Sequence, residues 1–280
     1  MPTAQERLSM STQPPVVNKQ FTVLDCQAAR TQGRKIVVVT AYDYPTAQML
    51  DEAGVDIQLV GDSLGMVVQG HSHSLTVTLD EMIYHTKMVA RAARRSMVVT
   101  DMPFMTYQIS PQQALENAGR IIQEGGAHAV KLEGGIRTAA AIAAITAADI
   151  PVMGHVGLTP QSIHAFGGFK VQRDEDRLLA DAQAVAQAGA FALVVEGVPA
   201  ELGTRITAGI PIPTIGIGAG AGCDGQVLVF HDLFQYGLGR RPKFVKSYAN
   251  LSQSIMDGTR SFINEVRQGT FPDAGHQYSS

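Results

Sequence analysis

The sequence predicts an α/β fold, a single (β/α)8 TIM barrel. Short β-type runs alternate with helical patterns, and eight such units fall within about 210 residues. The β-type runs are almost continuously apolar, as expected for parallel strands that are buried on both faces. No break in composition divides the chain, which favours one barrel over two domains. A doubly wound open sheet is the alternative.

The eight predicted strands share short runs of Val, Ile, Leu and Ala that end at glycine or at a polar residue. Strands of this length and composition are typical of a barrel interior. In chain order they cover residues 36–40, 57–60, 97–100, 129–132, 151–153, 192–195, 213–215 and 227–230.

The predicted helices show helical spacing of apolar residues and recognisable start signals. Pro45 occupies a permitted first-turn position. Thr78 begins Thr-Leu-Asp-Glu, which has the form of a capping box. The helices cover residues 21–32, 45–53, 78–93, 110–125, 138–148, 174–188, 200–208 and 248–268. The long loop 158–173 carries Gly167 and Gly168, and we expect it to act as a lid over the site.

This pattern divides the chain into three parts. Residues 1–20 are polar and are predicted to be a flexible N-terminal segment, residues 21–272 form the barrel domain, and residues 273–280 form a C-terminal tail.

Composition excludes several classes of protein. The 280 residues are 45% hydrophobic and 17% charged, enough for a large core. The net charge of −3 and the absence of a basic stripe argue against nucleic acid. Cys26 and Cys223 form no CxxC pair, which suits a reducing compartment. The sequence shows no signal peptide and no apolar run of about 20 residues, so we expect a cytoplasmic protein with no membrane partner.

Polar residues follow or end six of the predicted strands. They are Asp62, Asp101, Glu133, His155, Glu196 and His231. Lys131 precedes Glu133 by two residues, so both side chains point to the same side of their strand. A lysine buried there without a partner is costly, which favours a functional role.

Three of the acids predict a metal site. Asp62, Asp101 and Glu133 come from consecutive strands, and three adjacent carboxylates repel one another unless a cation is present. Oxygen ligands without cysteine suit Mg²⁺ or another divalent ion. The alternative is that the acids cap helices or form ion pairs at the rim of the barrel.

Four further residues have expected roles near this cluster. Glu196, on the sixth strand, lies across the barrel mouth, where a general base could face the substrate; a rim acid is the alternative. His155 is a metal ligand, a hydrogen-bond donor or a rim histidine. Asp43 and Ser63 are expected to contact the substrate or the ligands of the metal.

The glycine-rich run at residues 216–222 is a weak nucleotide signature. It follows the seventh strand, where barrels often bind phosphate. It lacks the acid about 20 residues further on that a dinucleotide site needs. The glycines could instead let the backbone pass close to a ligand.

Ten segments carry a resemblance to a known family, in family order from about residue 20 to 272. They are TAYDYP (40–45), VGDSLGMVVQGH (60–71), YHTKMV (84–89), DMPFMTY (101–107), VKLEGG (130–135), GHVGLTPQS (154–162), FGGFKVQ (166–172), PTIGIGAG (213–220), DGQVLV (224–229) and RPKFVKSYA (241–249). On these motifs the chain resembles the 3-methyl-2-oxobutanoate hydroxymethyltransferase family, also called ketopantoate hydroxymethyltransferase. The VEGVP context of Glu196 fits the family's acid, although Gly197 stands at a variable position.

The resemblance implies a barrel of the phosphoenolpyruvate-utilising type and a Mg²⁺-dependent, aldol-type reaction through an enolate. A hydroxymethyl group passes from the co-substrate 5,10-methylenetetrahydrofolate to 3-methyl-2-oxobutanoate, giving 2-dehydropantoate and tetrahydrofolate. This is the first step of (R)-pantoate synthesis in pantothenate biosynthesis. The resemblance also implies a homo-oligomer, a decamer.

Matched position by position, the resemblance implies roles for six residues. Asp62, Asp101 and Glu133 would bind the metal. Asp62, Ser63, Asp101 and Lys131 would bind the keto acid, and Glu196 would accept the proton.

Three alternatives stay open. One is another metal-dependent barrel acting on 2-oxo acids, a C–C lyase or a phosphonomutase relative; such a lyase is expected to carry a catalytic cysteine loop, and Cys223 is not in an obvious position for it. Another is a catalytically inactive binding barrel. The third is a metal-independent phosphosugar isomerase that uses the glycine-rich run.

Overall fold

The computed structural model describes residues 19–278. Almost all of the predicted N-terminal segment, and the last two residues of the predicted C-terminal tail, therefore lie outside the described residues.

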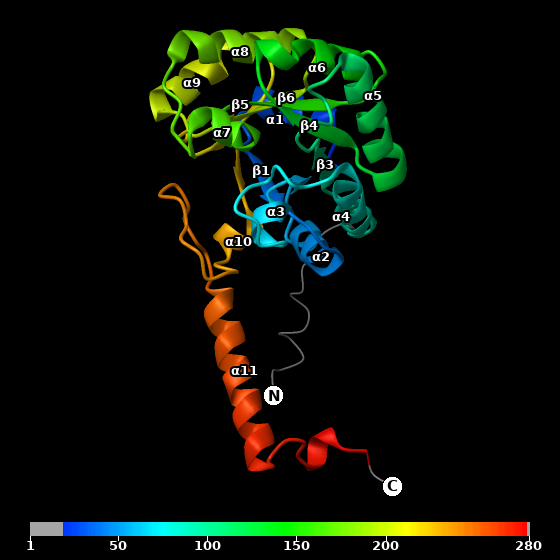
Figure 1. The fold of residues 1–280 in the computed structure, drawn as a ribbon, viewed down its shortest axis with the longest axis vertical. Coiled ribbons are helices and arrows are strands. Elements are labelled where there is room, and N and C mark those ends of the chain that lie inside the picture. Colours follow the sequence, from blue (N-terminus) through cyan, green and yellow to red (C-terminus); the bar gives the residue numbers. More distant parts are fainter. Residues whose placement is uncertain (1–18, 279–280) are drawn as a thin grey trace, which may run out of the picture.

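Eight parallel strands close into a barrel in chain order, with β8 paired to β1 (Figure 1). This confirms the predicted TIM barrel. The strands are β1 Ile36–Thr40, β2 Ile57–Val60, β3 Met97–Asp101, β4 Ala129–Glu133, β5 Val152–Gly157, β6 Ala192–Glu196, β7 Thr214–Ile217 and β8 Gly225–Leu228.

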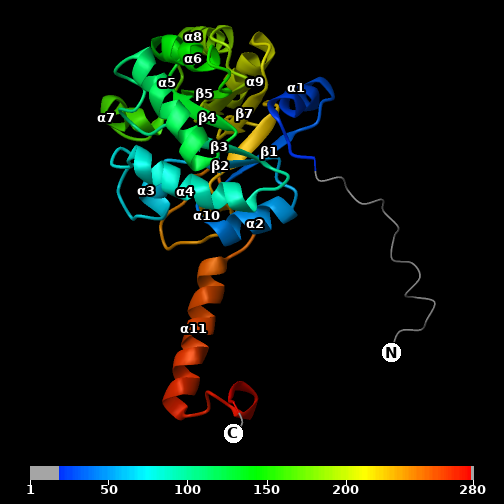
Figure 2. The ribbon, with the colours of Figure 1, turned by 90° about the vertical axis from the view of Figure 1, so that its right-hand side faces the viewer.

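Helices surround the barrel and extend beyond it (Figures 1 and 2). The α-helices are α1 Val23–Thr31, α2 Tyr44–Glu52, α3 Leu64–Val67, α4 Leu79–Ala92, α5 Pro111–Arg120, α6 Ala139–Thr146, α7 Ile163–Phe166, α8 Glu175–Gln187, α9 Ala200–Gly209, α10 Phe230–Leu233 and α11 Leu251–Gln268. Short helical turns of other types are η2 Ile121–Gly125, η3 Ile136–Thr138, η4 Pro160–Ser162 and η5 Ala274–His276.

Local sequence accounts for where α4 begins. The Thr78 side chain accepts a hydrogen bond from the Glu81 N–H, and Glu81 accepts one from the Thr78 N–H at 2.7 Å. The predicted capping box is therefore confirmed. The helix start is fixed by two hydrogen bonds between neighbours in the chain, and no distant contact is needed.

The alternation of side chains along each strand produces two apolar layers. One layer lies between the strands and the outer helices and includes Val98, Val130 and Leu193. The other fills the barrel interior, where Ile57 and Met153 pack with residues of α1. Since apolar side chains and α1 fill the N-terminal part of the barrel, the polar residues are left at the carboxyl ends of the strands.

Six of the eight strands, β3 to β8, differ at an end from the sequence prediction, and in β5 and β8 the difference changes where a predicted histidine lies. Strand β5 continues to Gly157, so His155 lies inside the strand. Strand β8 begins and ends two residues earlier than predicted, and His231 lies on α10 instead of at a strand end. The apolar run 227–230 extends from the strand into this helix, and such a run alone does not locate the boundary.

The glycine-rich run forms a short link between β7 and β8, without an intervening helix. A Cβ atom on Gly222 would overlap the side chain of Thr204, and one on Gly220 would overlap Ala200. Both neighbours belong to α9. These glycines are therefore needed so that the link can pack against a helix, which is a structural role that the sequence did not suggest.

Helix α11 leads away from the barrel in both views (Figures 1 and 2). None of its residues is buried, and Ile255, Phe262, Ile263 and Val266 are exposed. Over residues 19–278, no helix combines the length and apolar character needed to cross a membrane.

Replacing Gly157 by alanine is expected to destabilise the fold. Gly157 has a φ of 99°, and an added Cβ would overlap the Glu196 carbonyl oxygen, which accepts a hydrogen bond from the Leu158 N–H at 2.8 Å. We expect a loss of roughly 1–3 kcal/mol in the free energy of unfolding, measured by urea denaturation. The control Gly119→Ala, inside α5 with open space around it, should instead stabilise by about 0.5–1 kcal/mol. Equal midpoints of urea denaturation for the two variants would contradict this prediction.

Candidate active site

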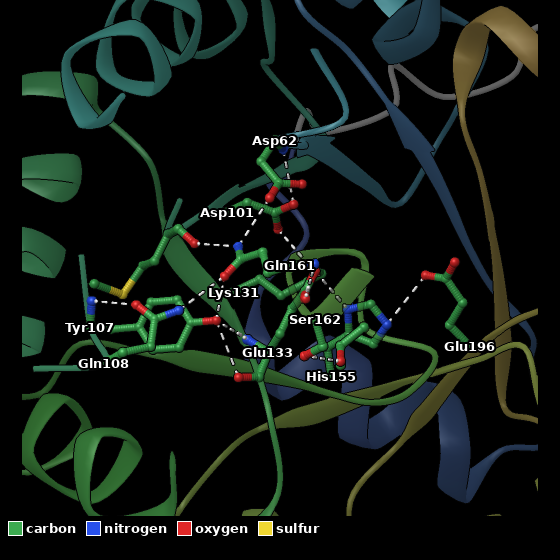
Figure 3. A network of polar contacts seen from close by, with 12 residues as sticks. Asp62, Asp101, Tyr107, Gln108, Lys131, Glu133, His155, Gln161, Ser162 and Glu196 are labelled. Carbon is green, nitrogen blue, oxygen red and sulfur yellow. Dashed lines mark hydrogen bonds and ion pairs between the residues drawn. The ribbon is translucent and has the colours of Figure 1, made fainter. Parts of the chain in front are cut away.

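The carboxyl ends of β3, β4, β5 and β6, and the residues that follow β2, bring six predicted side chains together (Figure 3). They are Asp62, Asp101, Lys131, Glu133, His155 and Glu196. Strand register explains part of this arrangement, because Asp101 pairs with Lys131 and Glu133 pairs with His155 on neighbouring strands. The side chain of Glu196 is 17% exposed and the other five residues are buried.

Lys131 is the ammonium group at the centre of the acids. Its Nζ lies 2.7 Å from Oδ1 of Asp101, and both side chains are buried. Burial alone would lower the pKa of Lys131, but the charges of Asp101, Glu133 and Asp62 hold that pKa above its usual value. Lys131 is therefore charged, and its positive charge stabilises the buried carboxylates around it.

One lysine does not neutralise three carboxylates. Burial, and then repulsion from Asp101, raises the pKa of Asp62 to about 7. Burial, and then repulsion from Asp62, raises the pKa of Glu133 well above its usual value. Without further positive charge these carboxyls therefore hold their protons more strongly, and a bound cation would favour their ionised forms.

His155 lies between two acids. Its Nδ1 is 3.6 Å from Oε1 of Glu133, and its Nε2 is 3.2 Å from Oε2 of Glu196. Burial, followed by repulsion from Lys131, lowers the pKa of His155 well below its usual value. A neutral imidazole carries one N–H, so His155 can donate to only one of these two acids at a time. Burial also raises the pKa of Glu196 to about 8, although the charge of Lys131 opposes this.

Two residues complete the network and were not predicted from the sequence. Gln161, on η4, donates from Nε2 to Oδ2 of Asp62 at 3.0 Å and from its backbone N–H to Oε2 of Glu133 at 2.9 Å. The Tyr107 hydroxyl donates to Oε1 of Gln161 at 2.6 Å. Both residues lie in motifs that resemble the family, but no spacing rule distinguishes them from neighbouring loop residues.

Ser63 and Asp43 are placed differently from each other. The Ser63 hydroxyl follows Asp62 directly and forms a hydrogen bond of 2.8 Å with the Tyr42 hydroxyl. Asp43 is exposed and caps α2, where its side chain accepts a hydrogen bond from the Thr46 N–H at 2.8 Å. The structure therefore gives Asp43 a helix-capping role and records no contact between it and the acid cluster.

The acids fit a hard divalent cation by their chemistry. Asp62, Asp101 and Glu133 offer carboxylate oxygens, which Mg²⁺ prefers, and the raised pKa values of Asp62 and Glu133 reflect burial with too little positive charge nearby. As the side chains stand, no three His, Cys, Asp or Glu residues within the described part of the chain are arranged to hold a metal ion. Gln161 donates to one oxygen of Asp62 and to one oxygen of Glu133, and it leaves the other oxygen of each carboxylate for an ion.

Cys223 lies outside this cluster. It is buried in the link between β7 and β8, where burial raises the pKa of its thiol, and its backbone oxygen accepts a hydrogen bond from Lys35 at 2.5 Å. Lys35 directly precedes β1, so this contact is at the amino-terminal end of the barrel. This position argues against the cysteine-dependent lyase alternative.

Comparison with known proteins gives consistent results. A family model described as ketopantoate hydroxymethyltransferase matches residues 20–274. The 3-methyl-2-oxobutanoate hydroxymethyltransferases of Trichlorobacter lovleyi and Geobacter sulfurreducens are each 54% identical, over 94% of this chain and 100% of theirs. That of Syntrophus aciditrophicus is 52% identical over 96% of this chain and 100% of its own.

Solved structures show the same fold at low identity. Phosphonopyruvate hydrolase aligns with a TM-score of 0.62 and 14% identity, covering 94% of this chain and 92% of that one. A 2,3-dimethylmalate lyase, described as a member of the PEP mutase/isocitrate lyase superfamily, aligns with a TM-score of 0.58 and 17% identity, covering 88% of both chains. These likenesses show the same barrel fold.

Proposed function

Because this chain belongs to the ketopantoate hydroxymethyltransferase family, we propose that its strand-end cluster transfers a hydroxymethyl group to 3-methyl-2-oxobutanoate. The product is 2-dehydropantoate, from which (R)-pantoate is made in pantothenate biosynthesis. We take 5,10-methylenetetrahydrofolate as the donor of the carbon atom, water as the source of the hydroxyl oxygen, and tetrahydrofolate as the leaving product. The observation that carries the proposal is a buried lysine among three carboxylates, with a half-buried fourth acid within contact of His155.

Asp62, Asp101 and Glu133 are the residues that would hold Mg²⁺ or another divalent ion. The bound ion would supply Lewis-acid stabilisation of negative charge on the oxygens of the 2-oxo acid. The raised pKa values of Asp62 and Glu133, which a bound cation would lower, support this assignment.

Lys131 and Ser63 are positioned to bind the keto acid, together with Asp62 and Asp101. The charged Lys131 ammonium attracts the substrate carboxylate and stabilises the negative charge that develops on the keto oxygen when the C3 proton leaves. The Ser63 hydroxyl, held by Tyr42, can donate a further hydrogen bond.

Glu196 is the proposed proton acceptor. Its carboxylate has a raised pKa and is more exposed than the other acids, so it has both the basicity and the access that removal of a C3 proton requires. His155 lies 3.2 Å from Oε2 of Glu196 and would fix the orientation of that carboxylate. The resulting enolate carbon then attacks the one-carbon unit.

We expect the C3 proton exchange rate to fall as pH is lowered through about 8. A base must be ionised, and the pKa of Glu196 is raised to about 8, so the ionised fraction drops about tenfold per pH unit below that value. His155 stays neutral in this range because its pKa is lowered. NMR-monitored exchange into D₂O at saturating Mg²⁺ checks this. A midpoint near pH 4.5 would contradict it.

The direct test is product formation. The purified protein, 3-methyl-2-oxobutanoate, methylenetetrahydrofolate and Mg²⁺ should give 2-dehydropantoate by mass spectrometry. EDTA should abolish the activity, and added Mg²⁺ should restore it. Activity that persists in EDTA would argue for a metal-independent reaction, and absence of product would overturn the proposal.

Two properties stay predictions. One is a homo-oligomeric state, which the resemblance implies is a decamer, and the other is a cytoplasmic location. The exposed apolar side chains of α11 support self-association, because apolar groups on an isolated helix are stabilised when a partner covers them.

A further inference from the structure

Gln161 connects two of the proposed metal ligands through different atoms. Its Nε2 donates to Oδ2 of Asp62 and to the Met102 carbonyl oxygen, each at 3.0 Å, and its backbone N–H donates to Oε2 of Glu133 at 2.9 Å (Figure 3). Gln161 is 7% exposed. A single buried residue therefore fixes one oxygen on each of two carboxylates.

The orientation of the Gln161 amide is determined by its partners. An ionised Asp62 and the Met102 carbonyl can only accept hydrogen bonds, so the NH₂ group must face them. The amide oxygen faces the other way, where it accepts from the Tyr107 hydroxyl at 2.6 Å and from Nε2 of Gln108 at 3.2 Å. A flipped amide would turn its oxygen towards Asp62 and the Met102 carbonyl and would lose both of these hydrogen bonds, and this holds the side chain in place.

Gln161 belongs to the 158–173 loop, whereas Asp62 is 99 residues away in sequence. We propose that Gln161 is a positioning residue, which sets the spacing and orientation of Asp62 and Glu133 for a divalent cation. The loop carries Gln161, so its conformation and the metal affinity are linked. This inference rests on the proposed metal-dependent function and adds a residue that does not itself contact the substrate.

The test measures Mg²⁺ binding to the whole protein by calorimetry, without substrate. Gln161→Leu removes both side-chain donors and the amide oxygen, and we expect Mg²⁺ to bind about 10- to 100-fold more weakly, as when other groups that orient metal ligands are lost. Gln172→Leu is the matched control. Gln172 lies in the same loop but forms hydrogen bonds with Lys170 and Arg177. The Gln172→Leu protein should therefore bind Mg²⁺ as tightly as the unsubstituted protein does.

A second readout separates positioning from folding. When the Mg²⁺ concentration is raised by the factor by which Gln161→Leu lowers the Mg²⁺ affinity, the activity of this variant should recover to within about threefold of that of the unsubstituted protein. If Gln161→Leu does not fold, Tyr107→Phe replaces it. That variant keeps the buried ring, removes the hydroxyl that orients the amide and that also bonds to the Glu133 backbone, and should weaken Mg²⁺ binding about 3- to 10-fold.

Each outcome has a clear meaning. Unchanged Mg²⁺ affinity in a folded Gln161→Leu, or in Tyr107→Phe where the first variant is unfolded, overturns the positioning role and leaves the proposed function intact. If Gln172→Leu weakens Mg²⁺ binding as much as Gln161→Leu does, the positioning role is overturned as well, because any substitution in the loop would then lower the Mg²⁺ affinity. If the unsubstituted protein does not bind Mg²⁺, both the positioning role and the metal assignment fail together.

Discussion

Glu196→Gln should lower the rate of hydroxymethyl transfer by about 100- to 10 000-fold, with Mg²⁺ and 3-methyl-2-oxobutanoate still bound. The amide has nearly the shape of the carboxyl group and can keep its contact with His155 at 3.2 Å, but it cannot accept the C3 proton. The measurement is deuterium exchange at C3 of the keto acid in D₂O without folate, which isolates proton removal from carbon transfer.

Glu201→Gln is the control for this substitution. Glu201 is exposed in the first turn of α9, and the same chemical change there should leave the exchange rate unaltered. An exchange rate in Glu196→Gln equal to that of the unsubstituted protein would remove Glu196 as the base. Lost binding of the keto acid in that variant would instead make Glu196 a binding residue.

Asp101→Asn is expected to weaken Mg²⁺ binding by about 100-fold or more, because it replaces one of three charged ligands by a neutral amide. Asp101 also accepts a hydrogen bond from the Asp62 N–H at 3.1 Å and pairs with Lys131, so the variant disturbs the neighbouring ligand and the substrate-binding lysine as well. Calorimetric titration with Mg²⁺ gives the affinity directly.

The control is Asp176→Asn, on the exposed first turn of α8, which should bind Mg²⁺ like the unsubstituted protein. Since Asp62 and Glu133 still face Lys131 after Asp101→Asn, the ammonium keeps acidic neighbours and we expect the variant to fold. A metal affinity equal to that of the unsubstituted protein would show that Asp101 is not a ligand.

The sequence by itself determined the barrel, because the signals are local. Each strand is an apolar run that ends at a turn, and α4 begins where Thr78 and Glu81 hydrogen-bond to each other's backbone. It also predicted which acids lie close together. The carboxyl ends of parallel strands meet at one end of a barrel, so the acids at those ends had to gather there.

Only the tertiary structure decided which atoms meet within that site. Gln161 reaches Asp62 across 99 residues, and Tyr107 reaches Gln161 across 54. These contacts depend on how two loops fold over the barrel mouth, which no local pattern encodes.

The neutral state of His155 follows from burial and the nearby Lys131, and the glycines of the β7–β8 link are needed for contact with α9. Local patterns determine the conformation of short segments, whereas burial, side-chain direction and charge balance arise only when distant segments pack together.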